Sequence, residues 1–484
     1  MGLVTPVDPV PLRELGRVHF TGIGGAGMSG IARIMLASGI AVSGSDAVPS
    51  AQLSELAALG ARVAVGHAAE HLGDADTLVV SSAIRPDNPE LTAARHRGLR
   101  VLHRASALAS LMLGDGAGAG QNIAVAGTHG KTTTTSMITT VLRHCGADPS
   151  YVIGGILAQT GLGADLGTGT AFVAEADESD GSFLMLAPDA AIVTCVEADH
   201  LDNYTDLAQI EAAFTAFAGK ITAGGLLISC ADDEGARALA VRAAGPGLRV
   251  LSYGTAAGAD YQITRVSPRG MSTALTVTGG PGTRAAADRP ADIEIAVPGR
   301  HNALNAAAAY ALAAELGYPR AGIAAGLAAY GGARRRMEVK GEADGVTVLD
   351  SYAHHPTELA ADLAAARDVA AGGRVIAVFQ PHLFSRTRIF AAQFGAALDT
   401  ADEVLVLDIY PAREDPEPGV TGELVAAAVP GERARFVPDK AGVPGLIAGL
   451  AKPGDLVLTM GAGDVTALGP LIVAALRDRA GEPA

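Results

Sequence analysis

The feature that most constrains the fold is a repeated unit: a short apolar run, a turn of glycine or polar residues, and a segment with helical periodicity. "RVHFTGIGGAGMSGIARIMLASG" and "NIAVAGTHGKTTTT" are two instances, and "DLVLTMGAGDVTALGPLIVAAL" repeats the unit near the other end. Strands that alternate with helices in this way belong to parallel sheets covered by helices. We therefore predict an α/β fold with largely parallel sheets.

Breaks in this pattern predict the domain organisation. A chain of 484 residues accommodates two to four domains. "GDGAGAG" at 114–120 has the composition of a flexible linker, and β-branched runs at 246–298 predict a small antiparallel insertion. We predict three α/β domains, at 1–115, 121–331 and 332–484. The first and third are expected to be Rossmann-like, and the central one to resemble a phosphate-loop ATPase.

Charge and hydropathy exclude several classes of protein. The net charge of −15 argues against nucleic acid or an anionic membrane as a partner. No apolar run is long enough to span a bilayer, and the N-terminal residues lack the pattern of a signal peptide. The three cysteines show no CxxC spacing. We expect a cytoplasmic protein without membrane insertion.

"AGTHGKTTTT", at 126–135, has the features of a phosphate-binding loop between a strand and a helix. Gly127 and Gly130 permit a tight turn, and Lys131 brings positive charge to the phosphates. Backbone N–H groups at the start of the helix can bind phosphate oxygens. The threonines are poor helix formers, and a hydroxyl at Thr132 is placed to bind Mg²⁺. The alternative is a structural turn, because the Walker pattern wants glycine where this chain has Val125.

Acidic residues after two later strands strengthen the phosphate-loop prediction. "AEADESD" offers Glu175, Asp177, Glu178 and Asp180, and "EADHLDNY" offers Asp199, His200 and Asp202. The carboxyl ends of parallel strands meet at one edge of a sheet. Glu175 with Thr132 is a plausible Mg²⁺ set, whereas His200 alone could equally be structural.

"TGIGGAGMSG" matches the G-x-G-x-x-G pattern at Gly22, Gly24 and Gly27, and Asp46 follows the next strand. Taken alone, this turn favours an NAD-dependent dehydrogenase. Pyrophosphate binding is generic, however, and a UDP-linked ligand would use the same turn. Further polar residues near strand ends could complete a nucleotide pocket or be surface and capping groups: His67, Ser81, Ser82 and Arg104.

Taken in order, the motifs of nearly the whole chain resemble the Mur ligases of peptidoglycan synthesis. The motifs are "GIGGAGMSG", "SGSD", "VVSSAI", "DNPE", "GTHGKTTT", "EADESDGSF", "ADHLDNY", "PGRHNALNA", "RRRME", "YAHHPTE", "FQPH" and "MGAGD". The short loop of that family, G-T-x-G-K-[ST], has no glycine at the position of Val125. The form of the first motif resembles the alanine-adding member most.

The resemblance implies a set of site residues in each domain. The ATP site would comprise Gly127, Thr128, His129, Gly130, Lys131, Thr132, Thr133, His301, Asn302, Asn305, Arg336 and Asp350. Thr132, Glu175 and His200 would hold Mg²⁺. The UDP-sugar would contact Gly22, Gly24, Gly25, Gly27, Asp46, His67, Ser81, Ser82 and Arg104. Tyr352, His354, His382 and Arg386 would line the amino-acid end, and Lys131, Arg336 and His354 would be catalytic.

The chain departs from the family pattern at two places. Ser351 and Ala353 stand where D-D-Y-G-H-H-P is common, and Leu383 and Phe384 stand where Arg and Tyr are usual. Structural alternatives also apply to the C-terminal motifs. "HHP" could cap a helix, any one arginine of "RRR" could lie on a solvated face, and Tyr352 could pack rather than bind.

The resemblance implies an ATP- and Mg²⁺-dependent ligase that joins L-alanine to UDP-N-acetylmuramate through an acyl phosphate. The expected protein is a monomer or a weak homodimer. Within the family, the alternative is a ligase that adds a peptide to the same sugar nucleotide. Outside the family, the alternatives are a dehydrogenase and a nucleotide-switched binding module.

Overall fold

The computed structural model describes residues 3–114, 121–412 and 414–481. The chain divides into two compact units. The first comprises Met1–Thr264, Val277–Ala291 and Asn305–Tyr330, and the second comprises the remaining segments. The division near 330 lies one residue from the predicted boundary at 331. The three-domain division itself stays a prediction, and the predicted linker at 115–120 lies outside the described residues.

The N-terminal sheet is parallel throughout, with strand order β3-β2-β1-β4-β5. Every residue of β1 is buried, as expected for a strand covered on both faces. The sequence pattern does not name β3, an edge strand with little burial. The strands are β1 (Val18–Thr21), β2 (Val42–Asp46), β3 (Arg62–Val65), β4 (Thr77–Val80) and β5 (Arg100–His103). The helices are η1 (Leu12–Leu15), α1 (Ala26–Ala37), α2 (Ala51–Ala58), η2 (Ala69–Leu72), α3 (Pro89–His96) and α4 (Arg104–Leu113).

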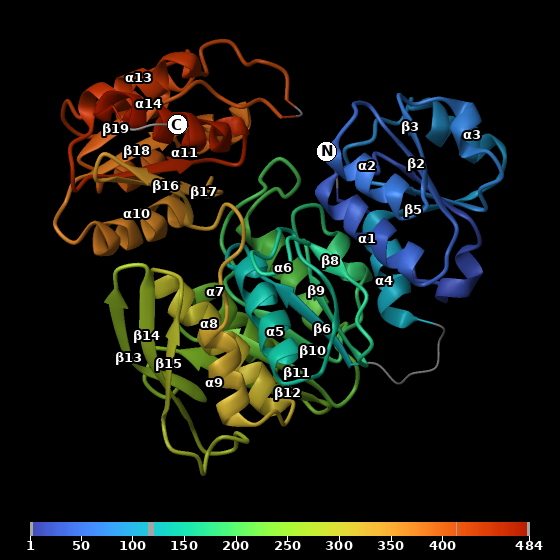
Figure 1. Ribbon diagram of the computed structural model, residues 1–484. Coiled ribbons are helices and arrows are strands. Elements are labelled where there is room, and N and C mark those ends of the chain that lie inside the picture. The colour runs from blue at the N-terminus through green and yellow to red at the C-terminus, as the bar shows by residue number, and fades with distance from the viewer. Residues whose placement is uncertain (1–2, 115–120, 413, 482–484) are drawn as a thin grey trace. The chain divides into compact units, whose positions relative to one another are not determined.

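The central sheet has ten strands, in the order β15-β14-β13-β12-β11-β10-β6-β9-β7-β8. α9 packs against α5, which follows the phosphate loop (Figure 1). The strands are β6 (Gln121–Ala126), β7 (Ser150–Val152), β8 (Ala164–Asp165), β9 (Ala171–Glu175), β10 (Ala190–Val193), β11 (Gly225–Cys230), β12 (Leu248–Gly254), β13 (Tyr261–Arg269), β14 (Ser272–Gly279) and β15 (Ala291–Ile295). The helices are α5 (Lys131–His144), η3 (Ser182–Met185), α6 (Leu207–Ala218), α7 (Glu234–Ala243), α8 (Arg300–Glu315) and α9 (Arg320–Ala328).

The antiparallel insertion is confirmed but begins later than predicted. β12 lies inside the predicted range of 246–298, yet it pairs in parallel with β11 and continues the main sheet. β13 and β14 are separated by two residues, a connection short enough only for an antiparallel hairpin. The β-branched composition of the region therefore did not distinguish β12, a parallel strand of the main sheet, from the β13–β14 hairpin.

The C-terminal sheet has six strands, in the order β16-β17-β21-β18-β19-β20, and is parallel except for the β16–β17 pair. Apolar residues on both faces of the sheet form two core clusters. The strands are β16 (Glu338–Ala343), β17 (Val346–Ser351), β18 (Val375–Phe379), β19 (Glu403–Val406), β20 (Ala434–Phe436) and β21 (Leu456–Met460). The helices are α10 (Pro356–Ala370), α11 (Phe384–Leu398), α12 (Glu423–Ala428), η4 (Lys440–Gly442), α13 (Val443–Leu450), η5 (Asp464–Ala467) and α14 (Leu468–Ala480).

Two expectations from composition can be compared with the fold. All three cysteines are free. Among the described residues, none of the helices combines the length and the apolar character that crossing a membrane requires.

Candidate active site

The phosphate loop is a strand-to-helix turn, as the sequence predicts. β6 ends at Ala126, and α5 begins at Lys131. Gly127 and Gly130 have φ of 137° and 82°, in the region that favours glycine. Loop residues are fixed on the segment after β10: Thr128 N donates to Cys195 O at 3.0 Å. The two glycines are therefore required by the backbone.

We expect Gly127→Ala to destabilise the protein more than alanine at another glycine with positive φ. A Cβ at Gly127 would lie 2.0 Å from Thr194 Oγ1, so strain adds to a clash with a buried residue. A Cβ at Gly146, with φ of 79°, meets nothing within 4 Å. Gly146→Ala should lower the free energy of unfolding by about 1–2 kcal/mol, and Gly127→Ala by more. Urea unfolding of both variants measures the difference, and equal losses would contradict the packing argument.

Lys131 forms the centre of the loop. Its Nζ donates to Gly127 O at 2.6 Å, to Thr128 O at 3.0 Å and to Glu178 Oε1 at 2.8 Å. Burial acts to lower the pKa of Lys131, but the charges of Glu178 and its acidic neighbours outweigh burial and raise it. Lys131 is therefore a fixed positive charge at the start of α5.

Thr132 and Glu175 are brought together, as predicted for a Mg²⁺ site. Thr132 Oγ1 donates to Glu175 Oε1 at 3.1 Å, and Gly154 N donates to Glu175 Oε2 at 2.7 Å. A hydroxyl and a carboxylate are oxygen donors of the kind that Mg²⁺ prefers, and such sites use one or two protein groups beside phosphates. The pair fits the metal that the sequence predicts.

His200 lies beside two acids of the neighbouring turns. Its Nε2 lies 3.6 Å from Glu178 Oε1 and 3.6 Å from Asp199 Oδ2. His200 thus shares Glu178 with Lys131, and its role as a metal ligand stays a prediction. Its φ of 53° is unusual for a residue with a side chain and reflects a tight turn after β10.

Two acids of the "AEADESD" motif contact residues that follow strands of the N-terminal sheet. Arg104, a predicted UDP-sugar residue, forms an ion pair with Asp177. Ser82, another predicted UDP-sugar residue, hydrogen-bonds Asp180. Burial raises the pKa of Asp177, but the charges of Arg104 and Lys131 lower it more, so it stays ionised.

The N-terminal glycine turn follows β1 and is held by Asp46. Gly24 N donates to Asp46 Oδ2 at 2.9 Å, so this carboxylate orders the turn itself. Gly22 has a φ of 80°. The remaining predicted residues follow the carboxyl ends of other strands: His67 after β3, Ser81 and Ser82 after β4, and Arg104 after β5. The expected nucleotide residues therefore gather at one edge of the sheet.

α8 carries three predicted ATP residues, of which Asn305 lies beside the phosphate loop. Asn305 Oδ1 accepts from Thr134 Oγ1 at 3.2 Å and lies 2.7 Å from where a Cβ of Gly130 would be. Asn302 and His301 belong to the second unit. Asn302 Nδ2 donates to Pro298 O at 2.7 Å, and His301 Nε2 lies 3.5 Å from Asp362 Oδ1.

In the second unit, the residues predicted for the amino-acid end form an aromatic cluster. The His354 ring lies 5.3 Å from Tyr352 and 5.9 Å from His382, centroid to centroid. Arg336 lies over the Tyr352 ring, and its Nη1 is 3.8 Å from Glu358 Oε1. These residues are therefore brought together. Arg386 is buried on α11.

Neighbouring residues give His355 and Arg335 structural roles, of which the helix cap is the alternative that the sequence offered. His355 caps α10, because its Nδ1 accepts from Thr357 N at 3.4 Å. Arg335 donates to the carbonyls of Gly461 and Gly463, which makes this arginine a structural support of the "MGAGD" turn.

Asp350 is fully buried and accepts from Thr459 Oγ1 and Thr466 Oγ1, both at 2.7 Å. These contacts give Asp350 a structural role, and its predicted contact with the nucleotide stays a prediction. At the first departure from the family pattern, Ser351 hydrogen-bonds Asp362. A carboxylate from α10 therefore stands beside the position where the pattern has an acid.

At the second departure, Leu383 is buried and has a φ of 69°. Its backbone N–H donates to Tyr410 O at 3.0 Å, and α11 begins at the next residue, Phe384. The leucine therefore forms the entrance to α11.

The comparisons with known proteins agree with this arrangement. Three family models match: "Mur ligase family, catalytic domain" at 17–115, "Mur ligase middle domain" at 125–313 and "Mur ligase, glutamate ligase domain" at 335–463. A UDP-N-acetylmuramate–L-alanine ligase from Thermobifida fusca is 57% identical over 98% of this chain and 100% of its own. The chain belongs to the Mur ligase family. It is therefore an enzyme of the ligase class, and the dehydrogenase and switch-module alternatives are not supported.

Two solved structures resemble this Mur ligase over most of their length. A UDP-N-acetylmuramate–alanine ligase from Thermotoga maritima has a TM-score of 0.79 at 28% identity and covers 96% of this chain and 100% of its own. A murein peptide ligase from Psychrobacter arcticus has a TM-score of 0.69 at 26% identity, covering 95% and 98%. The predicted fold class is thereby confirmed.

Sequence reasoning about this Mur ligase offered Glu178 as one acid among several but gave it no role. The structure pairs it with Lys131, and its side chain is only 3% exposed. Spacing along the chain could not predict this pair, because "AEADESD" offers four acids and the turn after β9 decides which one faces Lys131.

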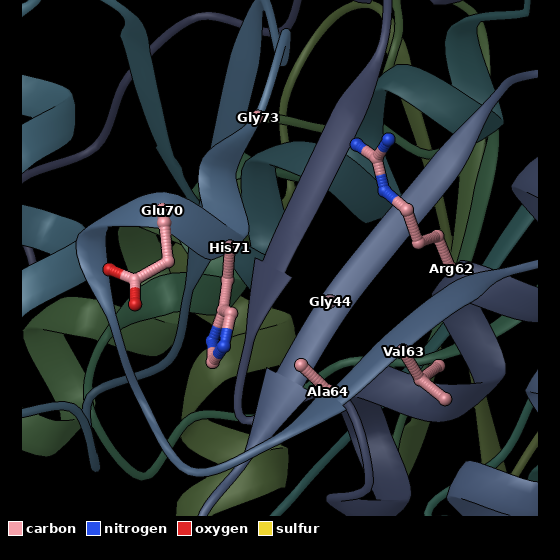
Figure 2. A pocket seen from close by; sticks show the side chains of 7 residues that line it. All are labelled: Gly44, Arg62, Val63, Ala64, Glu70, His71 and Gly73. Carbon is pink, nitrogen blue, oxygen red and sulfur yellow. The ribbon is translucent and has the colours of Figure 1, made fainter.

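A cavity of about 260 Å³ lies beside β2, β3 and η2 of this Mur ligase. Figure 2 shows Glu70 and His71 on the η2 side and the Arg62 guanidinium across the strands from them. Its lining comes from the bodies of the strands and from η2, and contains none of the predicted site residues.

Proposed function

We propose that this Mur ligase joins L-alanine to the lactyl carboxylate of UDP-N-acetylmuramate, with ATP as the source of energy. The observation that carries the proposal is the 57% identity, over nearly the whole chain, to a relative named for this reaction. The phosphate loop with Lys131, Thr132 and Glu175 supports the use of ATP. The free cysteines are compatible with a reducing compartment, and we place the reaction in the cytoplasm.

A nucleoside triphosphate is needed because a carboxylate does not condense with an amine in water. A carboxylate oxygen attacks the γ-phosphorus, the bond to the bridging oxygen breaks, and ADP leaves. The acyl phosphate then has phosphate as its leaving group. The alanine nitrogen attacks the carbonyl carbon, loses a proton, and phosphate departs.

The first step brings two anions together. At about 4 Å and an effective dielectric near 20, two like unit charges repel by roughly 4 kcal/mol. Lys131 is a fixed cation at the place where the loop would receive phosphates, and backbone N–H groups of α5 point there as well. Thr132 and Glu175 would hold Mg²⁺, which supplies further positive charge to the phosphate oxygens.

For the second step we assign His354 to the amine. Its Nδ1 lies 3.0 Å from Tyr352 O, and a carbonyl oxygen only accepts, so Nδ1 carries the hydrogen. In the neutral ring Nε2 then has the lone pair and can accept a proton. Arg336, beside Tyr352, is assigned to the γ-phosphate by resemblance alone.

A comparison of amino acceptors tests the proposal. We expect kcat/KM for L-alanine to exceed the values for glycine and L-serine, and we expect no product with a tripeptide as the acceptor. The likeness to a murein peptide ligase makes the tripeptide the informative competitor. A higher kcat/KM for the tripeptide would reassign the chain to peptide addition, and failure of all four acceptors with ATP and UDP-N-acetylmuramate would reject the proposal.

Hydroxylamine tests the intermediate separately. Added with ATP, Mg²⁺ and UDP-N-acetylmuramate but without alanine, it should attack the acyl phosphate and give a hydroxamate of the sugar nucleotide. Mass spectrometry detects the product, and omission of ATP is the control. Absence of hydroxamate under conditions that support full turnover with alanine would argue against the acyl phosphate.

A further inference from the structure

Glu90, which the function proposed above does not use, is the most enclosed carboxylate of the N-terminal sheet. It lies at the start of α3 and is 0% exposed. Its Oε2 accepts from Thr21 Oγ1 at 2.6 Å and from Ser45 Oγ at 2.7 Å. Three further groups lie within 3.3 Å of its two oxygens: His19 Nε2, Ala68 N and His71 Nδ1. This one side chain therefore ties together β1, β2 and the segment after β3.

Glu90 is ionised at neutral pH. Burial raises its pKa, but the hydrogen bonds from His19, Thr21 and Ser45 outweigh burial and lower the pKa to about 2. An ionised carboxylate has no hydrogen to give and can only accept. The hydroxyl hydrogen of Ser45 must therefore point to Glu90, since two acceptors 2.7 Å apart and buried would otherwise face each other.

The orientation of Ser45 fixes the neighbouring imidazole. Ser45 Oγ lies 2.8 Å from His67 Nδ1. Because the single hydrogen of Ser45 is given to Glu90, Ser45 can only accept from His67, and Nδ1 must carry the hydrogen. In the neutral ring the other nitrogen, Nε2, then carries a lone pair and accepts hydrogen bonds. His67 is 21% exposed, so a ligand can reach it.

The strand order places His67 at the nucleoside end of the site. The glycine turn after β1 is the expected pyrophosphate position, and β3 lies two strands away, or roughly 10 Å. On the other side of β1, Ser82 and Arg104 contact the acids that follow β9, beside the phosphate loop. The reacting carboxylate of the ligand must lie on that side, so the nucleobase of the ligand lies on the β3 side.

We propose that Glu90 and Ser45 are positioning residues that hold His67 as a hydrogen-bond acceptor for the imide N–H of uracil. Uracil presents an N–H at position 3, whereas cytosine has an acceptor there. We call the hydrogen-bonded series Glu90–Ser45–His67 the relay. The relay thus selects a uridine nucleotide over a cytidine nucleotide. This inference rests on the proposed function, because it takes the ligand to be UDP-linked.

Calorimetric titration with UDP and CDP tests the relay without catalysis. The full-length enzyme should bind UDP about 10-fold or more tightly than CDP. Ser45→Ala removes the acceptor from His67 Nδ1, since Glu90 Oε2 is 3.8 Å away and too far to replace it. We expect the CDP/UDP ratio of Kd values to fall to about 3-fold or less, mainly through weaker UDP binding.

Ser43→Ala is the matched control. Ser43 is also a buried hydroxyl on β2, but it lies 2.9 Å from His19 Nδ1 and does not contact His67. This variant should keep the wild-type ratio. An unchanged ratio in Ser45→Ala would overturn the relay. Absence of UDP binding by the wild-type enzyme would instead reject the UDP-sugar part of the proposed function.

The tautomer of His67 can be read directly from imidazole ¹⁵N chemical shifts, with His67→Gln used for assignment. The wild type should show the hydrogen on Nδ1, and Glu90→Gln should shift the population towards hydrogen on Nε2. An Nε2–H tautomer in the wild type would overturn the proposal. The measurement on the wild type does not depend on whether Glu90→Gln folds.

Discussion

Lys131→Ala is expected to lower turnover by roughly 10²-fold or more, the scale seen when one electrostatic contact to transferring charge is removed. Lys131 is the cation that the loop holds at the start of α5, with contacts to Gly127, Thr128 and Glu178. In the proposed mechanism, its loss deprives the phosphoryl group and the attacking carboxylate of a fixed positive charge. Steady-state turnover at saturating ATP measures the loss, and turnover within about threefold of the parent would remove the loop from the chemistry.

The same substitution leaves Glu178 as an unpaired buried charge, which costs stability in its own right. Lys131→Met combined with Glu178→Gln removes both charges, so the fold should be retained while the phosphate contact is still missing. We expect the double variant to melt near the parent and to be as slow as Lys131→Ala. Lys220→Ala, at an exposed lysine after α6, controls for the loss of a positive charge and should keep full activity. Recovery of turnover in the double variant would show that the single variant acts through misfolding.

Glu90→Gln is expected to lower the free energy of unfolding by about 3 kcal/mol at pH 7. The pKa of Glu90 is about 2 in the folded protein, compared with an ordinary value of 4.5. Each pKa unit corresponds to about 1.4 kcal/mol, so the difference between 4.5 and about 2 amounts to about 3 kcal/mol. Glutamine has the same shape but cannot be ionised, and its amide would add donors to a cluster that already supplies them.

The pH dependence has a definite sign. Because the folded pKa is depressed, the contribution of Glu90 is fully present above pH 4.5 and is lost as the pH falls towards 2. The difference in unfolding free energy between wild type and Glu90→Gln should therefore be largest at pH 6 to 7 and shrink below about pH 4.5. Urea unfolding across this range measures it. Glu70→Gln, at an exposed neighbour, should show no such difference, and a constant penalty for Glu90→Gln at all pH values would contradict the linkage.

Much of the fold could be predicted because it depends on neighbours in the chain. The apolar run of β6, the glycines of the loop and the threonines of α5 predict strand, turn and helix in the right places. The prediction failed at β12, where composition resembles the insertion but hydrogen bonds run in parallel to β11. Composition records the preference for a strand, whereas the direction of pairing is a property of two distant segments.

The candidate site divides in the same way. The Thr132–Glu175 pair could be predicted, because Glu175 ends one strand and Thr132 follows its neighbour at the carboxyl edge of one parallel sheet. The partner of Lys131 could not be predicted among four nearby acids, since the turn after β9 decides which one faces the loop. Similarly, the "RRR" run does not reveal that Arg335 supports a backbone turn, or that Arg335 and Arg336 both lie over the Tyr352 ring.

The order of the residues alone determined the class of fold, the phosphate loop and the family, because periodicity, glycine positions and motif spacing are local or can be compared along the chain. Only the tertiary structure decided that Glu90 joins β1, β2 and the segment after β3, and that Asp177 and Asp180 face Arg104 and Ser82. The physical reason is that charges and hydrogen-bond partners interact over a few ångströms in space. Residues that are far apart in sequence can lie within such short distances, and the register of the sheets decides which of them meet.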